Sequence, residues 1–138
     1  MTASHDFPIR VYYEDTDAGG IVYHASYLRF AERGRTELLR EHGFQNSDLS
    51  NEFNILFVVR HMEIDYLKPA RLDDNLVVST SIQWVRNSSL LMRQDIKLDE
   101  TILCSCMVTV VTVNAEGKPT RIPDDLRKMF NTYLSESE

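Results

Sequence analysis

The sequence predicts a single α+β domain in which one long helix packs on an antiparallel β-sheet. Apolar side chains recur at offsets of three and four over residues 27–38, which is the spacing of one helix face. Most of the following sequence consists of segments in which apolar and polar residues alternate, as in strands with one buried face. One helix followed by strands at hairpin spacing indicates the α+β class. With 138 residues the chain fits one domain, residues 1–138, with its core at about 9–130.

The predicted helix begins near residues 23–26 and ends near Gly43, a typical residue beyond a helix C-terminus. Gly34 lies within its apolar stripe, where the missing side chain lets a neighbouring segment approach closely. The opposite face carries arginines and glutamates and is expected to face solvent. The apolar stripe consists of Tyr27, Phe30, Ala31, Gly34 and Leu38.

Strands are predicted on both sides of this helix. The first, at residues 7–14, is rich in β-branched and aromatic residues. The last is apolar on both faces, as in a covered central strand. A single helix covers only part of such a sheet, so we expect the rest to be covered by association, with a dimer as the minimal solution. The strands after the helix are predicted at residues 55–67, 76–84, 89–98 and 101–113, followed by a short helix at 125–134.

Composition excludes several classes of protein. The net charge of −6 and the pI near 5.2 argue against a general nucleic-acid binder. No apolar run approaches the ~18 residues needed to cross a bilayer, and the N-terminal residues lack the apolar region of a signal peptide. We therefore expect a cytoplasmic protein that does not insert into the membrane.

Cys104 and Cys106 are predicted to be buried free thiols. They alternate with Ser105 in an apolar strand, so they point to the same side, where a disulfide between them would be strained. The four histidines lie scattered, without the paired spacing of a metal site. We expect no metal.

The chemistry of the chain points to residues 10–27, RVYYEDTDAGGIVYHASY. Here a predicted strand ends in Asp17, two adjacent glycines turn the chain, and the helix begins. The start of a helix exposes backbone N–H groups with a partial positive charge, which can stabilise a carbonyl oxygen that gains negative charge. A carboxylate near such donors can attack the carbonyl or activate water. The alternative is that Asp17 is an ordinary turn residue.

This segment resembles the signature of the 4-hydroxybenzoyl-CoA thioesterase family, and most closely that of its tol–pal-associated acyl-CoA thioesterase branch. A second stretch, RHMEIDYLKPARLDD at residues 60–74, supports the resemblance, which extends over about residues 9–129. The signature positions are Arg10, Val11, Thr16, Asp17, Gly20, Ile21, Val22, His24 and Tyr27.

The resemblance implies a hot-dog fold, in which the sheet wraps the long helix, and an assembly of two or four subunits with active sites between them. It implies that Asp17 is the catalytic residue, as nucleophile or as general base. The backbone amides that polarise the substrate carbonyl in this family correspond to residues around Tyr23 and His24. Of these two, we expect the Tyr23 N–H to be the donor. Coenzyme A is then part of the substrate, and no cofactor is retained.

Two further residues near Asp17 have alternative interpretations. The His24 side chain can orient water or contact the thioester, or it can simply pack against the start of the helix. Asp15 lies two residues before Asp17, so on an extended strand both carboxylates project to one side and Asp15 can raise the pKa of Asp17. The alternative is that Asp15 is a solvated or capping acid.

Coenzyme A carries phosphates, so cationic side chains are expected to contact it. With Gly20 in the signature loop, the expected substrate-binding residues are Arg60, His61, Lys68 and Arg71. Further candidates are Arg86, Lys118 and Arg121. The alternative is that these cations solvate strand edges and turns.

The function predicted from the sequence is hydrolysis of acyl-CoA thioesters. An acyl-carrier-protein thioesterase is the first alternative, because acyl carrier protein presents the same pantetheine arm and would then be a partner. A hot-dog dehydratase or hydratase fits the signature less well. A non-catalytic, envelope-associated acyl-binding scaffold would not need the carboxylate of Asp17.

Overall fold

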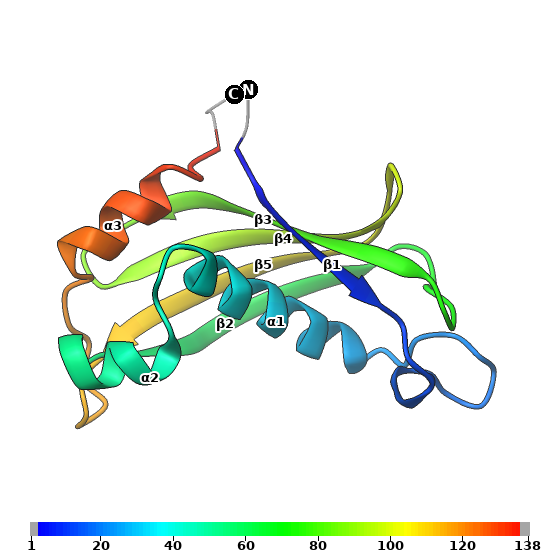
Figure 1. Cartoon of the computed structure of the whole chain (residues 1–138), viewed down its shortest axis with the longest axis horizontal. Helices are drawn as coiled ribbons and strands as arrows, with labels where there is room; N and C mark the ends of the chain where they lie inside the picture. Colours follow the sequence, from blue (N-terminus) through cyan, green and yellow to red (C-terminus); the bar gives the residue numbers. More distant parts are fainter. Residues whose placement is uncertain (1–2, 136–138) are drawn as a thin grey trace.

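A computed structural model describes residues 3–135 and shows one five-stranded antiparallel sheet that curves around a long helix (Figure 1). The predicted architecture of one long helix on an antiparallel sheet is confirmed. The helices are α1 (Ser26–Glu41), α2 (Asn46–Asp48) and α3 (Asp124–Asn131), with a π-helical turn at Leu49–Phe53. The strands are β1 (His5–Arg10), β2 (Leu56–Tyr66), β3 (Asn75–Val85), β4 (Ser89–Leu98) and β5 (Thr101–Val113).

The strands lie in the order β1-β3-β4-β5-β2. β3, β4 and β5 form consecutive antiparallel hairpins, as their spacing predicted. β2 instead pairs with β5 at one edge, and β1 pairs with β3 at the other. The connection from β2 to β3 therefore runs from one side of the sheet towards the other, so only the last three strands follow the predicted hairpin order.

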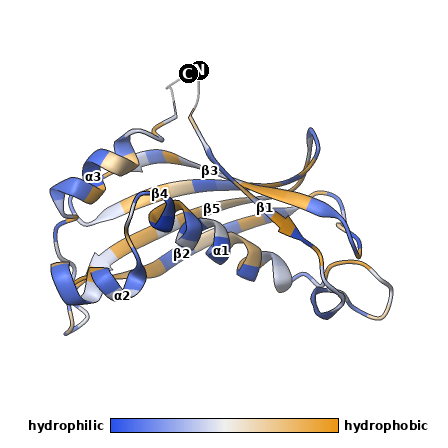
Figure 2. Ribbon diagram, in the orientation of Figure 1, coloured by the Kyte–Doolittle hydropathy of each residue, from blue (hydrophilic) through white to orange (hydrophobic). Residues whose placement is uncertain are grey.

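The core lies between α1 and the sheet. The predicted apolar stripe of α1 is buried, and α1 packs on β1, β3 and β4. Figure 2 shows hydrophobic and hydrophilic residues alternating along α1, as in an amphipathic helix. In the central strand β5, Cys104 and Cys106 are buried free thiols, which confirms that prediction. The hydrogen bond to Cys106, together with burial, raises the pKa of the Cys104 thiol.

Gly34 is the point of closest approach between α1 and the sheet. A Cβ atom at this position would lie 2.6 Å from Cγ1 of Val78 on β3 and 3.2 Å from Nε2 of Gln94 on β4. The predicted close approach is thus present, and it is made to side chains of the sheet. A larger residue has no room there, because Val78 is itself fully buried.

Gly43 ends α1 as predicted. Its φ of +84° is the left-handed conformation that favours glycine. Its N–H donates to the Arg40 carbonyl at 3.0 Å, and the Phe44 N–H donates to the Leu39 carbonyl at 2.9 Å. This pair of bonds is the Schellman arrangement, which satisfies carbonyls at the end of a helix.

The first strand is shorter than predicted. β1 ends at Arg10, and Tyr13–Asp15 forms a 3₁₀ turn. The Asp15 carboxylate is buried and accepts a hydrogen bond from the Tyr12 N–H at 2.9 Å. This local bond closes the turn and overrides the strand preference of the aromatic residues before it.

β2 is an edge strand with unusually exposed apolar side chains. Val58 and Val59 are 45% and 44% exposed, although they point to opposite faces. At Arg60 a β-bulge shifts the pairing with β5.

No helix in the described part of the chain is long and apolar enough to cross a membrane.

Candidate functional site

Asp17 lies at the tip of a small hairpin that joins the 3₁₀ turn to α1. Its N–H donates to the Ile21 carbonyl at 2.9 Å, and an isolated bridge pairs Thr16 with Val22. Gly20 closes the turn with a φ of +80° and donates its N–H to the Asp17 carbonyl at 3.1 Å. The adjacent glycines therefore produce the tight change of direction that the sequence predicted, and they present Asp17 to solvent.

One oxygen of the Asp17 carboxylate is held and the other is available. Oδ1 accepts a hydrogen bond from the Gly19 N–H at 2.8 Å, which fixes the orientation of the side chain. Among residues 3–135, Oδ2 has neither a hydrogen bond nor an ion pair. A fixed carboxylate with one unused oxygen can attack a carbonyl carbon or take a proton from water.

The backbone amides after this hairpin differ in availability. The Tyr23 N–H donates to the Asp15 carbonyl at 2.9 Å, so this amide is already engaged. A substrate carbonyl could accept from the predicted Tyr23 donor only by displacing that bond. The neighbouring His24 N–H has no acceptor within the described residues and is available as a donor, as is the Ala25 N–H after it.

The start of α1 has no side-chain cap. Ala25 occupies the N-cap position, where no side chain accepts from the first turn, and that turn contains no acidic residue. Ser26, the first helical residue, donates its hydroxyl to the Asp15 carbonyl at 3.0 Å. The hydroxyl thus joins the start of α1 to the hairpin, where the buried Asp15 carboxylate lies 4.0 Å from Arg29 of the first helical turn.

A cavity of about 260 Å³ is lined by His24 and Val22 on the side of the hairpin. Tyr66, at the end of β2, donates its hydroxyl to the His24 carbonyl at 3.2 Å and forms part of the wall. Tyr27 forms another part, and its phenol oxygen accepts from the Ala70 N–H at 3.0 Å. Burial raises the pKa of Tyr27, so its phenol stays neutral. Lys68 also lines this cavity.

Some of the predicted substrate-binding residues meet at this site. Lys68 lines the cavity beside His24. Arg71 pairs with Ile21 of the hairpin, and the Leu72 N–H donates to the Gly20 carbonyl at 3.2 Å, so the segment after Lys68 runs along the hairpin.

The other predicted cations lie elsewhere in the protomer. His61 is five residues from Tyr66 along β2, which is about 16 Å, and it contacts Glu63 at 3.3 Å. Arg60 lies further away, at the bulge. Three more cations, beyond the far end of the sheet, cannot share this site within one chain. These are Arg86, Lys118 and Arg121.

Asp15 does not lie beside Asp17 in the way that an extended strand predicted. It belongs to the 3₁₀ turn, where its side chain is buried against the Tyr12 amide, whereas the Asp17 side chain is exposed. The premise of a shared face is therefore wrong. Asp15 organises the loop instead, because its backbone carbonyl accepts from both the Tyr23 N–H and the Ser26 hydroxyl.

Sequence reasoning missed the contributions of Tyr66 and Ser26. Tyr66 is 42 positions from His24, and no local pattern announces a contact over that separation. A role for Ser26 could have been proposed from its place at the predicted helix start. Serine at that place, however, indicates a helix cap and not a hydrogen bond to the Asp15 carbonyl. The described residues bring together no group of three His, Cys, Asp or Glu side chains that could hold a metal ion.

The curved antiparallel sheet around one long helix is the hot-dog fold, and an exposed carboxylate lies on a glycine hairpin at the start of that helix. Residues 19–105 match the sequence profile of the Thioesterase superfamily. The chain belongs to this superfamily and is a thioesterase.

Individual relatives are similar over nearly their whole length. The protein named acyl-CoA thioester hydrolase YbgC from Escherichia coli O6:H1 is 48% identical over 126 residues, which are 90% of this chain and 93% of that protein. The acyl-CoA thioesterase YbgC of Haemophilus influenzae is 43% identical over 126 residues, 91% of this chain and 93% of that protein. The crystal structure of a probable thioesterase from Bartonella henselae has 45% identity and a TM-score of 0.84, covering 88% of this chain and 100% of that one.

Proposed function

We propose that this protein hydrolyses acyl-CoA thioesters, with Asp17 as the catalytic carboxylate and the His24 amide as a carbonyl-polarising donor. The observation that carries the proposal is an exposed carboxylate with one unused oxygen, on the hairpin that leads directly into the start of α1, where the His24 amide has no acceptor among the described residues. The names of the Escherichia coli and Haemophilus influenzae relatives supply the substrate class.

Two routes lead from these groups to the same products. As a nucleophile, Asp17 attacks the thioester carbon, the carbon–sulfur bond breaks, and water then hydrolyses the mixed anhydride. As a general base, Asp17 takes a proton from water while the water oxygen attacks, and the tetrahedral intermediate expels the thiolate, which receives that proton. In both routes the His24 N–H stabilises the developing oxyanion, and no cofactor is consumed.

The backbone of His24, not its imidazole, is the proposed donor, and two substitutions separate them. His24→Phe keeps the N–H, and we expect turnover within a few-fold of the wild type. His24→Pro removes the N–H, and we expect kcat to fall about a hundredfold or more, as when an oxyanion donor is lost. Steady-state thiol release measures both, with circular dichroism as the folding control. A His24→Phe enzyme as impaired as His24→Pro would assign the function to the ring.

Lys68 and Arg71 are the proposed contacts of the coenzyme A phosphates. Reversing either charge, in Lys68→Glu or Arg71→Glu, is expected to raise KM about tenfold, because a charge-assisted hydrogen bond contributes about 1.5–3 kcal/mol. The effect on kcat is expected to be smaller, since a phosphate contact is made equally in the bound substrate and in the transition state. Lys118→Glu makes the same charge change beyond the far end of β5 and serves as the control. A loss of kcat without a rise in KM would contradict the assignment.

The functional unit that we propose is a homodimer formed through β2. This strand pairs with β5 on one side only, so its other edge presents free backbone groups next to exposed apolar side chains. A second copy related by a twofold axis supplies hydrogen-bond partners for this backbone edge and continues the sheet across the interface. Light scattering on the purified protein gives the subunit number directly. A dimer or a tetramer built from such dimers supports the proposal, and a stable monomer contradicts it.

Thiol release from a panel of acyl-CoAs, short, long and aromatic, tests the function itself. Turnover of at least one acyl-CoA supports the proposal. Turnover only when the acyl group is carried by acyl carrier protein would identify the acyl-carrier-protein thioesterase. Binding of acyl-CoA without thiol release would instead support the envelope-associated scaffold.

A further inference from the structure

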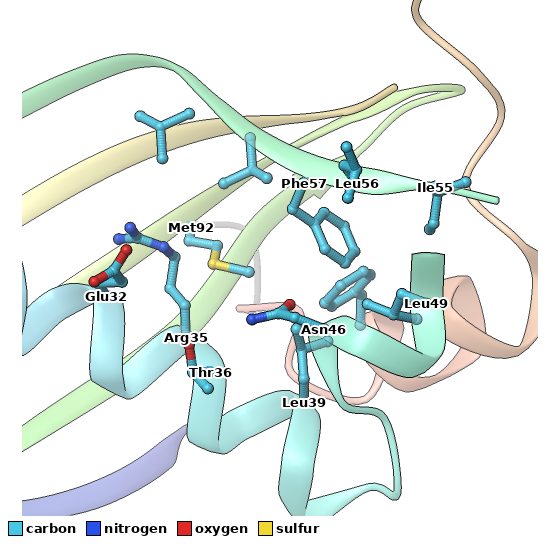
Figure 3. Close-up of a pocket in the computed structure, with 13 residues that line it drawn as sticks. Glu32, Arg35, Thr36, Leu39, Asn46, Leu49, Ile55, Leu56, Phe57 and Met92 are labelled. Atoms are coloured by element: carbon cyan, nitrogen blue, oxygen red, sulfur yellow. The ribbon is translucent and has the colours of Figure 1, made fainter. Parts of the chain in front are cut away.

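A second cavity, of about 280 Å³, lies at the other end of α1 from the hairpin of Asp17 (Figure 3). It opens between α1, the turn after α2 and the sheet. Glu32 and Arg35 of α1 lie at one end, and the labelled apolar residues Leu49, Ile55 and Phe57 lie at the other. A hydrophobic pocket with a few polar groups on one side is typical of a small-molecule site.

A row of apolar side chains on β2 connects the two cavities. Residues directly opposite one another in antiparallel strands share a face. On β5, Cys104, Cys106, Val108 and Val110 are buried, and Gln94, opposite Cys106 on β4, donates to the Ala31 carbonyl of α1, so this face looks towards the helix. The residues of β2 that share this face are Phe57, Val59, Met62, Ile64 and Tyr66.

α1 packs mainly on β1, β3 and β4, so this row is only partly covered: Phe57, Met62 and Ile64 are half-buried against the core. Val59 and Tyr66 remain 44% and 47% exposed. Tyr66 lines the cavity beside His24, and Val59 lines the second cavity. The row is therefore an apolar track with one end at the proposed reaction centre and the other in the second cavity, whose lining is apolar except for Glu32, Arg35, Thr36 and Asn46.

The length of the track fits one class of ligand. Tyr66 is opposite Cys104 and Val59 is opposite Val110, six residues further along β5, which corresponds to about 20 Å. An extended carbon chain advances about 1.25 Å per carbon, from bond lengths near 1.5 Å and bond angles near 111°. An unbranched acyl chain must thus have about 16 carbons to reach from the His24 amide into the second cavity.

We infer that the row on β2 and the second cavity form the binding track for the acyl chain, and that the preferred substrates carry long, unbranched aliphatic acyl groups. This inference rests on the proposed function and deepens it. Each methylene group added to the acyl chain covers further apolar surface of the track, and so strengthens binding, until the chain reaches the part of the second cavity lined by Leu49, Ile55 and Phe57. A second copy joined through the backbone edge of β2 leaves this face free to hold the chain.

Two neighbouring residues provide a matched test. Val59→Trp fills the entrance of the second cavity, and Val58→Trp adds the same bulk at equal exposure on the opposite face of β2. In the wild type, kcat/KM is expected to be higher for palmitoyl-CoA than for butyryl-CoA. In Val59→Trp the ratio of the two kcat/KM values is expected to fall about tenfold or more, as when two or more methylenes lose their burial. Val58→Trp is expected to keep the wild-type ratio.

Direct binding supplies a readout independent of catalysis. The fluorescent fatty acid cis-parinaric acid is expected to bind the wild type and Val58→Trp, to be displaced by palmitate, and to bind Val59→Trp weakly. Thr36→Phe, which narrows the same cavity from α1, replaces Val59→Trp if the latter does not fold. The track is overturned if Val59→Trp and Thr36→Phe keep the wild-type ratio of kcat/KM for palmitoyl-CoA to that for butyryl-CoA, or if the wild type prefers butyryl-CoA. Either result leaves the thioesterase proposal intact. A wild type that binds cis-parinaric acid as expected but hydrolyses no acyl-CoA overturns the proposed function and retains the track.

Discussion

Asp17→Asn is expected to lower kcat for acyl-CoA hydrolysis about a thousandfold, within the range of 10²–10⁴ that a positioned acid–base group contributes. The substitution keeps the size of the side chain, and the amide oxygen can still accept from the Gly19 N–H that holds Oδ1 at 2.8 Å. It removes the negative charge that attacks the thioester or takes the proton from water. Thiol release under saturating substrate measures the loss.

The controls for this variant separate chemistry from structure. Circular dichroism and light scattering should match the wild type, because the Asp17 side chain is exposed and buries no core atom. KM should change little, since the carboxylate acts mainly in the transition state. An Asp17→Asn enzyme with wild-type kcat would show that another group performs the reaction and would remove the basis of the proposed mechanism.

Gly34→Val is expected to lower the free energy of unfolding by about 3 kcal/mol, at the upper end of the usual cost of overpacking. Its Cβ alone would lie 2.6 Å from Cγ1 of Val78, which is fully buried and cannot turn into solvent. The higher helix propensity of valine recovers only a few tenths of a kcal/mol over glycine. Urea unfolding followed by circular dichroism measures the change.

Two companion variants test the cause of that loss. Arg33→Val places the same β-branched residue on the exposed side of α1 and is expected to cost only a few tenths of a kcal/mol. Gly34→Val combined with Val78→Ala removes the methyl group in the way, and it should be more stable than Gly34→Val alone. If the double variant were no better, the close approach at Val78 would not be the reason for glycine.

The sequence predicted the elements whose pattern is local. The stripe of Tyr27, Phe30 and Leu38 predicted α1, because burial of one face of a helix leaves a regular spacing in the chain. The predicted ranges of β4 and β5 agree with the structure for the same reason. The Asp17 hairpin was predictable because its adjacent glycines permit few other conformations.

What the sequence could not predict depends on bonds between separate segments. The strand preference of Tyr12 and Tyr13 gave no sign of the 3₁₀ turn, because the buried carboxylate of Asp15 decides it. Which amide is free at the start of α1 depends on the bond from Tyr23 to Asp15. The edge position of β2, and with it the apolar track, follows from pairing between strands about 45 residues apart in the chain, which periodicity does not encode.

The two ends of the described chain meet on one strand. His5 is opposite Thr80 of β3, and Leu134 is bridged to Ile82, two residues further along the same strand. In Figure 1 the start of β1 and the segment after α3 accordingly lie close together, at the opposite end of β1 from the loop that leads into α1. The same fold could therefore form from a chain in which these helices and strands follow one another in a different order. A short linker between the ends, with new ends opened in the exposed turn at residues 114–117, would give a circular permutant with the same sheet and the same site.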